Sequence, residues 1–167
     1  IIEDAAQSIG SQLSGRKSGS FGEIGCFSTH PLKNLNACGD GGFLTTNNSS
    51  IANKVRLFRN HGLVDRDTVQ MFGFVSRMDV LQANILEYRL LRLSDVIEKR
   101  RKNAEMYRKA LKSNYIYVPD EREKELNTYH TFVIQVSKRN QLRKYLLSQG
   151  IETAIHYPIP IHLQTAS

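Results

Sequence analysis

Four residues near the start of the chain carry side chains that could do chemistry together: Asp4, Gln7, Ser28 and Lys33. A lysine amine forms a Schiff base with an aldehyde, and a nearby acid can keep the nitrogen of a pyridine ring protonated. Together the four residues supply the functional groups needed to bind a pyridine-ring cofactor whose aldehyde forms a Schiff base with the lysine. Taken alone, Lys33 has a plainer interpretation as one of 23 lysines and arginines, since most lysines are solvent-exposed.

Two predicted strands would position these side chains. Residues 1–4 form a short run that begins with two isoleucines and ends in a carboxylate, and residues 24–27 form a second apolar run followed by Ser28. Pro31 interrupts the second run, so Lys33 falls on a connection just past the strand end. A lysine on such a connection can be held in one place.

Each of these residues also has a structural alternative. Carboxylates at strand ends, such as Asp4, also make salt bridges or cap helices, and Ser28 alone is indistinguishable from any serine at a strand end. The glycine- and serine-rich segment 10–22 is expected to be a loop that wraps a site, and a plain surface loop is a fair alternative. The residues by themselves leave both interpretations open.

The middle of the chain is predicted to hold a strand, a helix and a loop. Residues 43–46 are expected to be a strand after a glycine-rich turn. Residues 47–48 supply an N-cap for a helix with apolar positions at four- and three-residue steps, which Gly62 would end. Residues 63–76 are expected to be a loop.

A long interrupted helix should follow from residues 77–79, with Asp79 near its positive end. A helix of more than thirty residues without caps is unusual, so we expect a break near residues 93–94, with the domain boundary close to it. Its apolar positions fall on one stripe, which indicates a core or a subunit contact. The stripe consists of Leu81, Ile85, Leu86, Leu90, Leu93, Ile97, Ala104, Tyr107 and Leu111.

The last third is predicted to be a small α/β domain. The expected elements are strands over residues 115–118, 129–136 and 151–156, and a helix over residues 138–148. Ser137 would cap that helix and Gly150 would end it.

Composition narrows the class of protein. With 40% hydrophobic and 23% charged residues and no apolar run long enough to span a membrane, we expect a globular protein that is not membrane-bound. Cys26 and Cys38 form no CxxC pair and have no zinc-like partners, which predicts reduced thiols, no metal site and a cytoplasmic location. The net charge of +7 raises the question of nucleic acid. However, the basic residues within 88–112 are mixed with acids at helical spacing, which is typical of a solvated helix face, and no aromatic platform accompanies them, so we expect no nucleic-acid partner.

Seven segments of the chain together carry a family resemblance. They are EDAAQ, CFSTHPLKNL, GDGG, FRNHG, SRMDVLQANIL, KRRKNAEMYRKAL and HYPIPIH. In this order the chain resembles the DegT/DnrJ/EryC1/StrS sugar aminotransferases, which are fold-type I pyridoxal phosphate enzymes. Lys33 separates it from the related sugar dehydratases, which carry histidine at that position. The resemblance covers nearly the whole chain.

The resemblance implies an α/β fold that is a part of the fold-type I architecture. Residues 1–93 would be the C-terminal part of the large, mixed-sheet cofactor domain, and residues 94–167 most of a small α/β domain. Compared with the family, we expect the N-terminal half of the large domain and the last part of the small one to be missing, so that this fragment alone would be inactive.

The resemblance also implies the cofactor, pyridoxal 5'-phosphate, and a role for each residue. Lys33 would be both the Schiff-base partner and the base that moves a proton. Asp4 would pair with the pyridinium nitrogen, Gln7 would hydrogen-bond the ring hydroxyl, and Ser28 would bind the phosphate. The expected reaction transfers an amino group, with glutamate as the usual donor, to a keto sugar carried on a nucleotide.

Two further sets of residues are implied by relatives. His156, Tyr157 and His162 match a segment beside the active site and could contact substrate, although a rigid edge connection is an equal alternative. Relatives are homodimers in which an asparagine before the long helix reaches the phosphate of the other subunit. Here Val75 takes that position, so Ser76 and Arg77 become the candidate ligands, unless Val75 only packs against the helix start.

A second functional class stays open, that of a truncated or non-catalytic relative which acts only as an interaction module.

Overall fold

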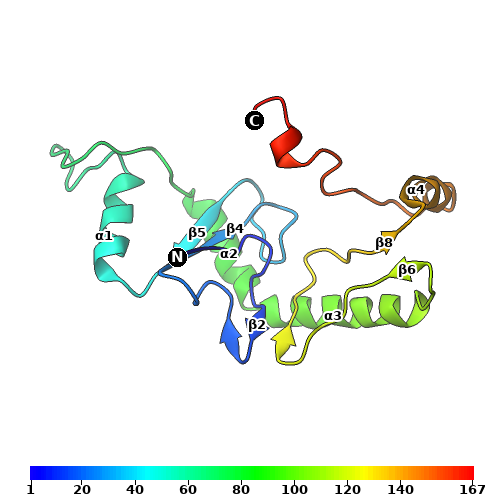
Figure 1. Ribbon diagram of the computed structural model, residues 1–167. Coiled ribbons are helices and arrows are strands. Elements are labelled where there is room, and N and C mark those ends of the chain that lie inside the picture. The colour runs from blue at the N-terminus through cyan, green and yellow to red at the C-terminus, as the bar shows by residue number, and fades with distance from the viewer. The chain divides into compact units, whose positions relative to one another are not determined.

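The computed structural model describes residues 1–167, which form two compact units (Figure 1). The first unit contains Ile1–Ala110 and Pro119–Phe132, and the second contains Leu111–Val118 and Val133–Ser167. Strands and helices occur in both units, in agreement with the predicted α/β class. None of the helices combines the length and the hydropathy that a membrane span requires. The predicted domain division at residue 93 concerns the full-length fold and stays a prediction.

A mixed three-stranded sheet lies at the centre of the first unit, in the order β1 (Ile2–Asp4), β4 (Ile24–Ser28), β5 (Gly42–Thr45). The two strands predicted at residues 1–4 and 24–27 are confirmed, and they pair in parallel. Strand β5 pairs with β4 in the antiparallel sense, which brings the chain back to the end of β4 at which it left. The rings of Phe27 and Phe43, opposite each other in this pair, stack with their centroids 4.8 Å apart.

The segment between β1 and β4 is more ordered than the predicted loop. It contains the hairpin of β2 (Gln12–Leu13) and β3 (Arg16–Lys17), and β2 also pairs with β7 (Glu125–Leu126). The pairing with β7 joins residues more than a hundred positions apart, which no local sequence pattern could indicate.

Glu3 holds the last part of this segment against the sheet. Its carboxylate accepts hydrogen bonds from the backbone N–H groups of Gly19, at 2.8 Å, and Gly22. Burial opposes ionisation, but the hydrogen bonds from Gly22, Gly19 and Phe21 outweigh it and lower the pKa of Glu3. A Cβ atom on Gly25 would lie 2.5 Å from the Gly19 backbone, so the loop can approach β4 only where both residues are glycine.

Helix α1 (Ser49–Phe58) begins and ends as the sequence predicts. Asn48 is the N-cap, and its Oδ1 accepts from the backbone N–H groups of Ser50 and Ile51 at 2.9 and 3.2 Å. At the other end Gly62 adopts a left-handed φ of 72° and donates its N–H to the carbonyl of Leu57 at 2.8 Å.

The long helical segment is broken, as predicted, into α2 (Val80–Leu90) and α3 (Leu93–Ala110). Asp79 occupies the N-cap position of α2 without making a side-chain cap bond. The predicted apolar stripe is buried only in part: Leu86 and Ala104 are buried, whereas Leu81 is 70% exposed. Leu86 forms the core of the unit together with Leu35 and Ala37, which belong to the loop after β4. Ile9, Met78 and Leu93 pack against this core.

The second unit contains the antiparallel pair β6 (Ile116–Tyr117) and β8 (Gln135–Val136), helix α4 (Arg139–Ser148) and a 3-10 turn η1 (Ile161–Leu163). The helix and its end at Gly150, which has a φ of 75°, were predicted correctly. The predicted cap was wrong, because Lys138 occupies the N-cap position and makes no side-chain cap bond.

Two predicted strands are corrected by the structure. Only Gln135–Val136 of the strand expected over residues 129–136 is present, and the first expected residue, Tyr129, has a positive φ of 46° that a strand does not allow. Residues 151–156 form no strand, since no neighbouring strand supplies the backbone partners that a ladder requires.

Candidate active site

The candidate site lies at the edge of the central sheet that is formed by the carboxyl ends of its parallel strands. Because β1 and β4 run parallel, their last residues, Asp4 and Ser28, both lie at this carboxyl edge. In α/β sheets, ligands bind outside the carboxyl ends of the parallel strands. The two side chains therefore stand where the fold class places its sites.

Asp4 is oriented by the turn that follows β1. Its Oδ1 accepts from the backbone N–H of Ala6 at 3.1 Å, and the carboxylate remains exposed. The N–H of Ala5 donates to the carbonyl of Cys26 at 2.8 Å and so extends the parallel ladder by one residue. Gln7 is exposed in this same turn. Both side chains are therefore carried by a short segment fixed to the strand end.

The loop that carries Lys33 is fixed at both ends. Thr29, which is fully buried, donates its N–H to the carbonyl of Gly41 at 2.9 Å and accepts from the N–H of Ala37 at 2.7 Å. The Oγ of Ser28 accepts from the N–H of His30 at 3.3 Å. These bonds continue the β4–β5 pairing into the loop, so the loop leaves and re-enters the sheet at one place (Figure 1).

Lys33 lies within this closed loop and is half-buried. Its backbone N–H donates to the carbonyl of His30 at 2.8 Å, and the N–H of Leu32 donates to the Nδ1 of His30 at 3.2 Å, which makes a tight turn just before the lysine. The residues that follow, Leu35 and Ala37, are buried in the core. The backbone of Lys33 is therefore held between a hydrogen-bonded turn and the core.

Two asparagines on either side of Leu35 complete the loop, and the sequence reasoning missed both. The Nδ2 of Asn34 donates to the carbonyl of Thr128 at 2.9 Å. Asn36 donates through Nδ2 to the carbonyl of Pro31 at 2.6 Å and receives the Nη1 of Arg89 on its Oδ1 at 2.9 Å. Amides on both sides of an apolar leucine indicate that the amides will be partly buried and will need hydrogen-bond partners. Thr128 and Arg89 lie too far along the chain for the sequence to identify them as these partners.

Arginines of α3 fix the segment that contains Thr128. Arg101 forms a two-pronged ion pair with Glu121 at 2.6 and 3.1 Å, and the hydrogen bond to Glu121 raises the pKa of Arg101. The guanidinium groups of Arg101 and Arg108 lie 6.0 and 5.6 Å from the ring centre of Tyr129, and burial raises the pKa of that phenol.

The structure gives Ser76 and Arg77 a different setting. Both are exposed on the connection between α1 and α2, where the N–H of Ser76 donates to the carbonyl of Arg59 at 2.9 Å. Val75 forms an isolated antiparallel β-bridge with Asn60, and this residue is 60% exposed. No hydrogen bond joins these residues to the residues at the sheet edge, so their predicted role stays a prediction.

His156, Tyr157 and His162 belong to the second unit, and all three are exposed. The rings of His156 and Tyr157 meet edge to face with their centroids 5.2 Å apart, and His162 lies in η1. Their contact with substrate therefore also stays a prediction.

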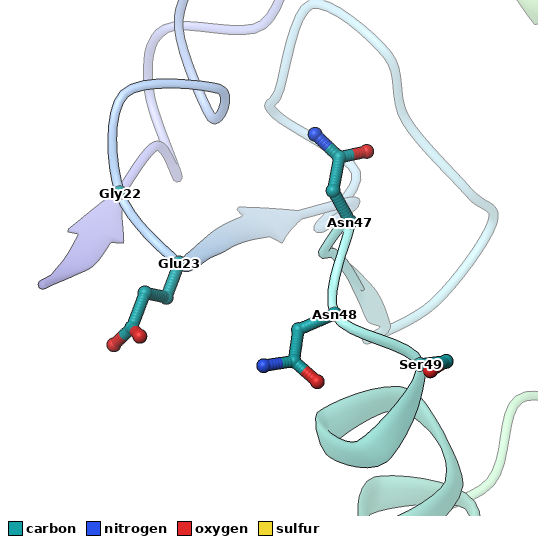
Figure 2. A pocket seen from close by; sticks show the side chains of 5 residues that line it. All are labelled: Gly22, Glu23, Asn47, Asn48 and Ser49. Carbon is teal, nitrogen blue, oxygen red and sulfur yellow. The ribbon is translucent and has the colours of Figure 1, made fainter.

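An open hollow of about 480 Å³ lies elsewhere in the first unit (Figure 2). Its lining residues are Gly22, Glu23, Asn47, Asn48 and Ser49. Glu23 directly precedes β4, so this hollow lies at the amino end of the strand. The candidate site lies at its carboxyl end and is a separate place on the sheet.

The residues at the carboxyl edge fit a pyridine-ring cofactor by their chemistry. They supply one carboxylate, one amine and one hydroxyl from Asp4, Lys33 and Ser28. Beside them, the buried Oγ1 of Thr29 makes no hydrogen bond, and a Cβ atom on Gly41 would lie 2.7 Å from it. Only glycine therefore lets the returning chain close against this part of the loop.

Comparison with known proteins gives a consistent result. The chain is 40% identical over 164 residues to the UDP-N-acetyl-3-dehydro-alpha-D-glucosamine 3-aminotransferase of Acidithiobacillus ferrooxidans, which covers 98% of this chain and 44% of the relative. It is also 40% identical over 166 residues to the dTDP-3-amino-3,6-dideoxy-alpha-D-galactopyranose transaminase of Aneurinibacillus thermoaerophilus. That match covers 99% of this chain and 46% of the relative.

A solved structure extends this result to the backbone. The crystal structure of S. venezuelae DesV in complex with a ketimine intermediate matches with a TM-score of 0.96 and 35% identity, over 99% of this chain and 45% of that one. The chain thus spans less than half the length of these relatives. The model of one family, the DegT/DnrJ/EryC1/StrS aminotransferase family, matches residues 1–167, and the chain belongs to this family.

Proposed function

We propose that this chain is the part of a nucleotide-sugar aminotransferase that holds pyridoxal 5'-phosphate as a Schiff base on Lys33. The observation that carries the proposal is the placement of Asp4 and Ser28 at one edge of the parallel pair β1–β4, with Lys33 on the loop that follows. Family membership over the whole chain supports it.

Each residue would have one task. When bound, the cofactor supplies an electron-poor ring that stabilises negative charge next to the transferred nitrogen. Asp4 would keep the ring nitrogen protonated, Gln7 would donate to the ring hydroxyl, and Ser28 would bind the phosphate. Lys33 would hold the aldehyde at rest and would move a proton during transfer, which requires its amine to be free of a permanent ion pair. No ion pair of Lys33 is present in the structure.

The substrate class follows from the relatives. Two of them are named for UDP- and dTDP-linked sugars, so the proposed acceptor is a nucleotide-linked keto sugar. The proposed amino donor is glutamate. His156, Tyr157 and His162 are proposed to contact substrate, and Ser76 and Arg77 to bind the cofactor phosphate across a homodimer. These residues are all exposed and available for such contacts.

The proposal is tested by locating the cofactor lysine. The full-length protein is incubated with pyridoxal 5'-phosphate, reduced with borohydride and digested, and the peptides are mapped by mass spectrometry. We expect the pyridoxyl group on Lys33, and a Lys33→Ala variant that takes up no label. Lys54→Ala, which removes an exposed lysine of α1, is the matched control and should label like the wild type. A label on another lysine would refute the assignment.

A further inference from the structure

The side chain of Asn34 ties the lysine loop to a segment 94 positions further along the chain. It follows Lys33 directly, is only 8% exposed, and donates from Nδ2 to the carbonyl of Thr128 at 2.9 Å. Because the acceptor is a backbone carbonyl, the amide must present its nitrogen to it. The bond is buried, so no water competes for either partner.

The acceptor of this bond is itself held firmly. Thr128 is fully buried, and the carbonyls on both sides of it accept from arginines of α3. Arg101 donates to the carbonyl of Asn127 at 2.7 Å, and Arg100 donates to that of Tyr129 at 3.0 Å. The Thr128 carbonyl is therefore a fixed point on the body of the first unit.

The loop needs such a point near its middle. The sheet fixes it through Thr29 and Gly41, and the core fixes it through Leu35 and Ala37. Among the residues between Thr29 and Leu35, Asn34 makes the side-chain bond to a distant segment. This bond thus adds a fixed point directly after Lys33, beside those that the sheet, the core and the Arg89–Asn36 contact provide.

We infer that Asn34 is a positioning residue for Lys33, with the Thr128 carbonyl as its fixed point. The inference rests on the proposed role of Lys33. A reacting group that is displaced by about 1 Å can lose on the order of a hundredfold in rate, so a bond one residue from the lysine affects turnover without touching substrate. Segment 119–132 therefore contributes to the site although it carries none of its chemistry.

The first test uses hydrogen exchange on the full-length protein without cofactor. In Asn34→Ala we expect amide exchange in peptides covering residues 29–37 to quicken by about tenfold or more. Ser11→Ala is the matched control, because it removes the 3.0 Å bond between the Oγ of Ser11 and the Oγ1 of Thr128 and leaves the Asn34 bond in place. In Ser11→Ala, exchange in the same peptides should change by less than about threefold. Unchanged exchange in Asn34→Ala would overturn the inference.

The second test uses the protein loaded with pyridoxal 5'-phosphate. Asn34→Ala should lower kcat by about ten- to a hundredfold and change the KM for the amino donor by less than about threefold, because a positioning residue acts on the reacting geometry. Ser11→Ala should keep kcat within about threefold of the wild type. Equal losses in the two variants would mean that Asn34 only stabilises the fold, and would overturn the inference.

Asn34→Leu, which keeps the side-chain volume and removes the donor, serves if Asn34→Ala does not fold. It should shift exchange and kcat in the same direction as Asn34→Ala, and a folded Asn34→Leu with wild-type values for both overturns the inference. The wild-type borohydride map separates the two proposals. A label on Lys33 combined with normal kcat in Asn34→Ala refutes only the positioning role, whereas no label on Lys33 refutes the proposed function itself.

Discussion

Asp4 is in register with Cys26 in the parallel pair of β1 and β4, and it ends its strand just before Ser28 ends the neighbouring one. The carboxylate and the hydroxyl are thereby set at one sheet edge by backbone pairing alone. A change of side chain at either position should alter chemistry and leave the strands in place.

Asp4→Asn should leave pyridoxal 5'-phosphate binding measurable and slow turnover by about a hundredfold, because a neutral amide no longer keeps the ring nitrogen charged. Cofactor titration and steady-state kinetics of the full-length protein measure the two effects. Glu23→Gln, at the opposite end of β4, is the control. Normal turnover in Asp4→Asn would show that Asp4 is structural.

Arg89→Ala should destabilise the protein by about 1.5 to 3 kcal/mol, because the guanidinium donates to both the carbonyl and the Oδ1 of Asn36. Urea unfolding measures the loss. The matched control is Arg92→Ala, since that exposed arginine reaches only its helix neighbourhood: its Nη1 donates to the Tyr88 hydroxyl at 3.2 Å and its guanidinium lies 5.7 Å from the centre of the Tyr88 ring. Equal losses in the two variants would contradict a specific role for Arg89 in bracing the loop.

Val75→Asn should tighten the binding of pyridoxal 5'-phosphate by about ten- to a hundredfold, the value of one hydrogen bond to a charged acceptor. Titration of the cofactor-free protein gives the dissociation constant, and sugar selectivity should not change. Val69→Asn is matched in exposure, at 59% against 60%, and should have no effect. An equal or weaker affinity in Val75→Asn means that the phosphate is not held from this position.

The free energy of unfolding should decrease at acidic pH, in part because Glu121 becomes protonated. Burial opposes its ionisation, but hydrogen bonds from Arg101 and the N–H of Asn127 outweigh this and lower the pKa of Glu121 below 4.5. A carboxylate with a lowered folded-state pKa contributes stability that is complete above 4.5 and is lost as the pH falls through the folded value.

Glu121→Gln should therefore be less stable than the wild type at neutral pH and lose less stability on acidification. Urea midpoints measured across the acid range test this. Glu123→Gln, which removes an exposed carboxylate two positions along, is the matched control for the loss of one negative charge. Parallel curves for Glu121→Gln and the wild type would disprove the assignment.

Local signals in the sequence were sufficient for much of the fold. The Asn48 cap, the left-handed Gly62 and the interruption between α2 and α3 each depend on a few adjacent residues, and all three were predicted. The carboxylate, the hydroxyl and the lysine were also placed correctly on strand ends and their connection.

The parts that could not be predicted depend on distant partners. Strand β2 pairs with the distant β7 as well as with β3, and Tyr129, where a strand was expected to begin, has a positive φ and a carbonyl that accepts from Arg100 of α3. Asn34 and Asn36 gain their importance from Thr128 and Arg89. The sequence pattern can indicate that a polar side chain will be buried and need a hydrogen-bond partner. It does not identify a partner that lies far along the chain.

The pairing of Ser28 with Gly42 closes the lysine loop into a ring of backbone whose two ends are one ladder step apart. The two strands and the loop are thereby closed by backbone pairing, which no side-chain substitution at Lys33 removes. A variant that lacks the amine should therefore keep the geometry of the strand ends that carry Asp4 and Ser28.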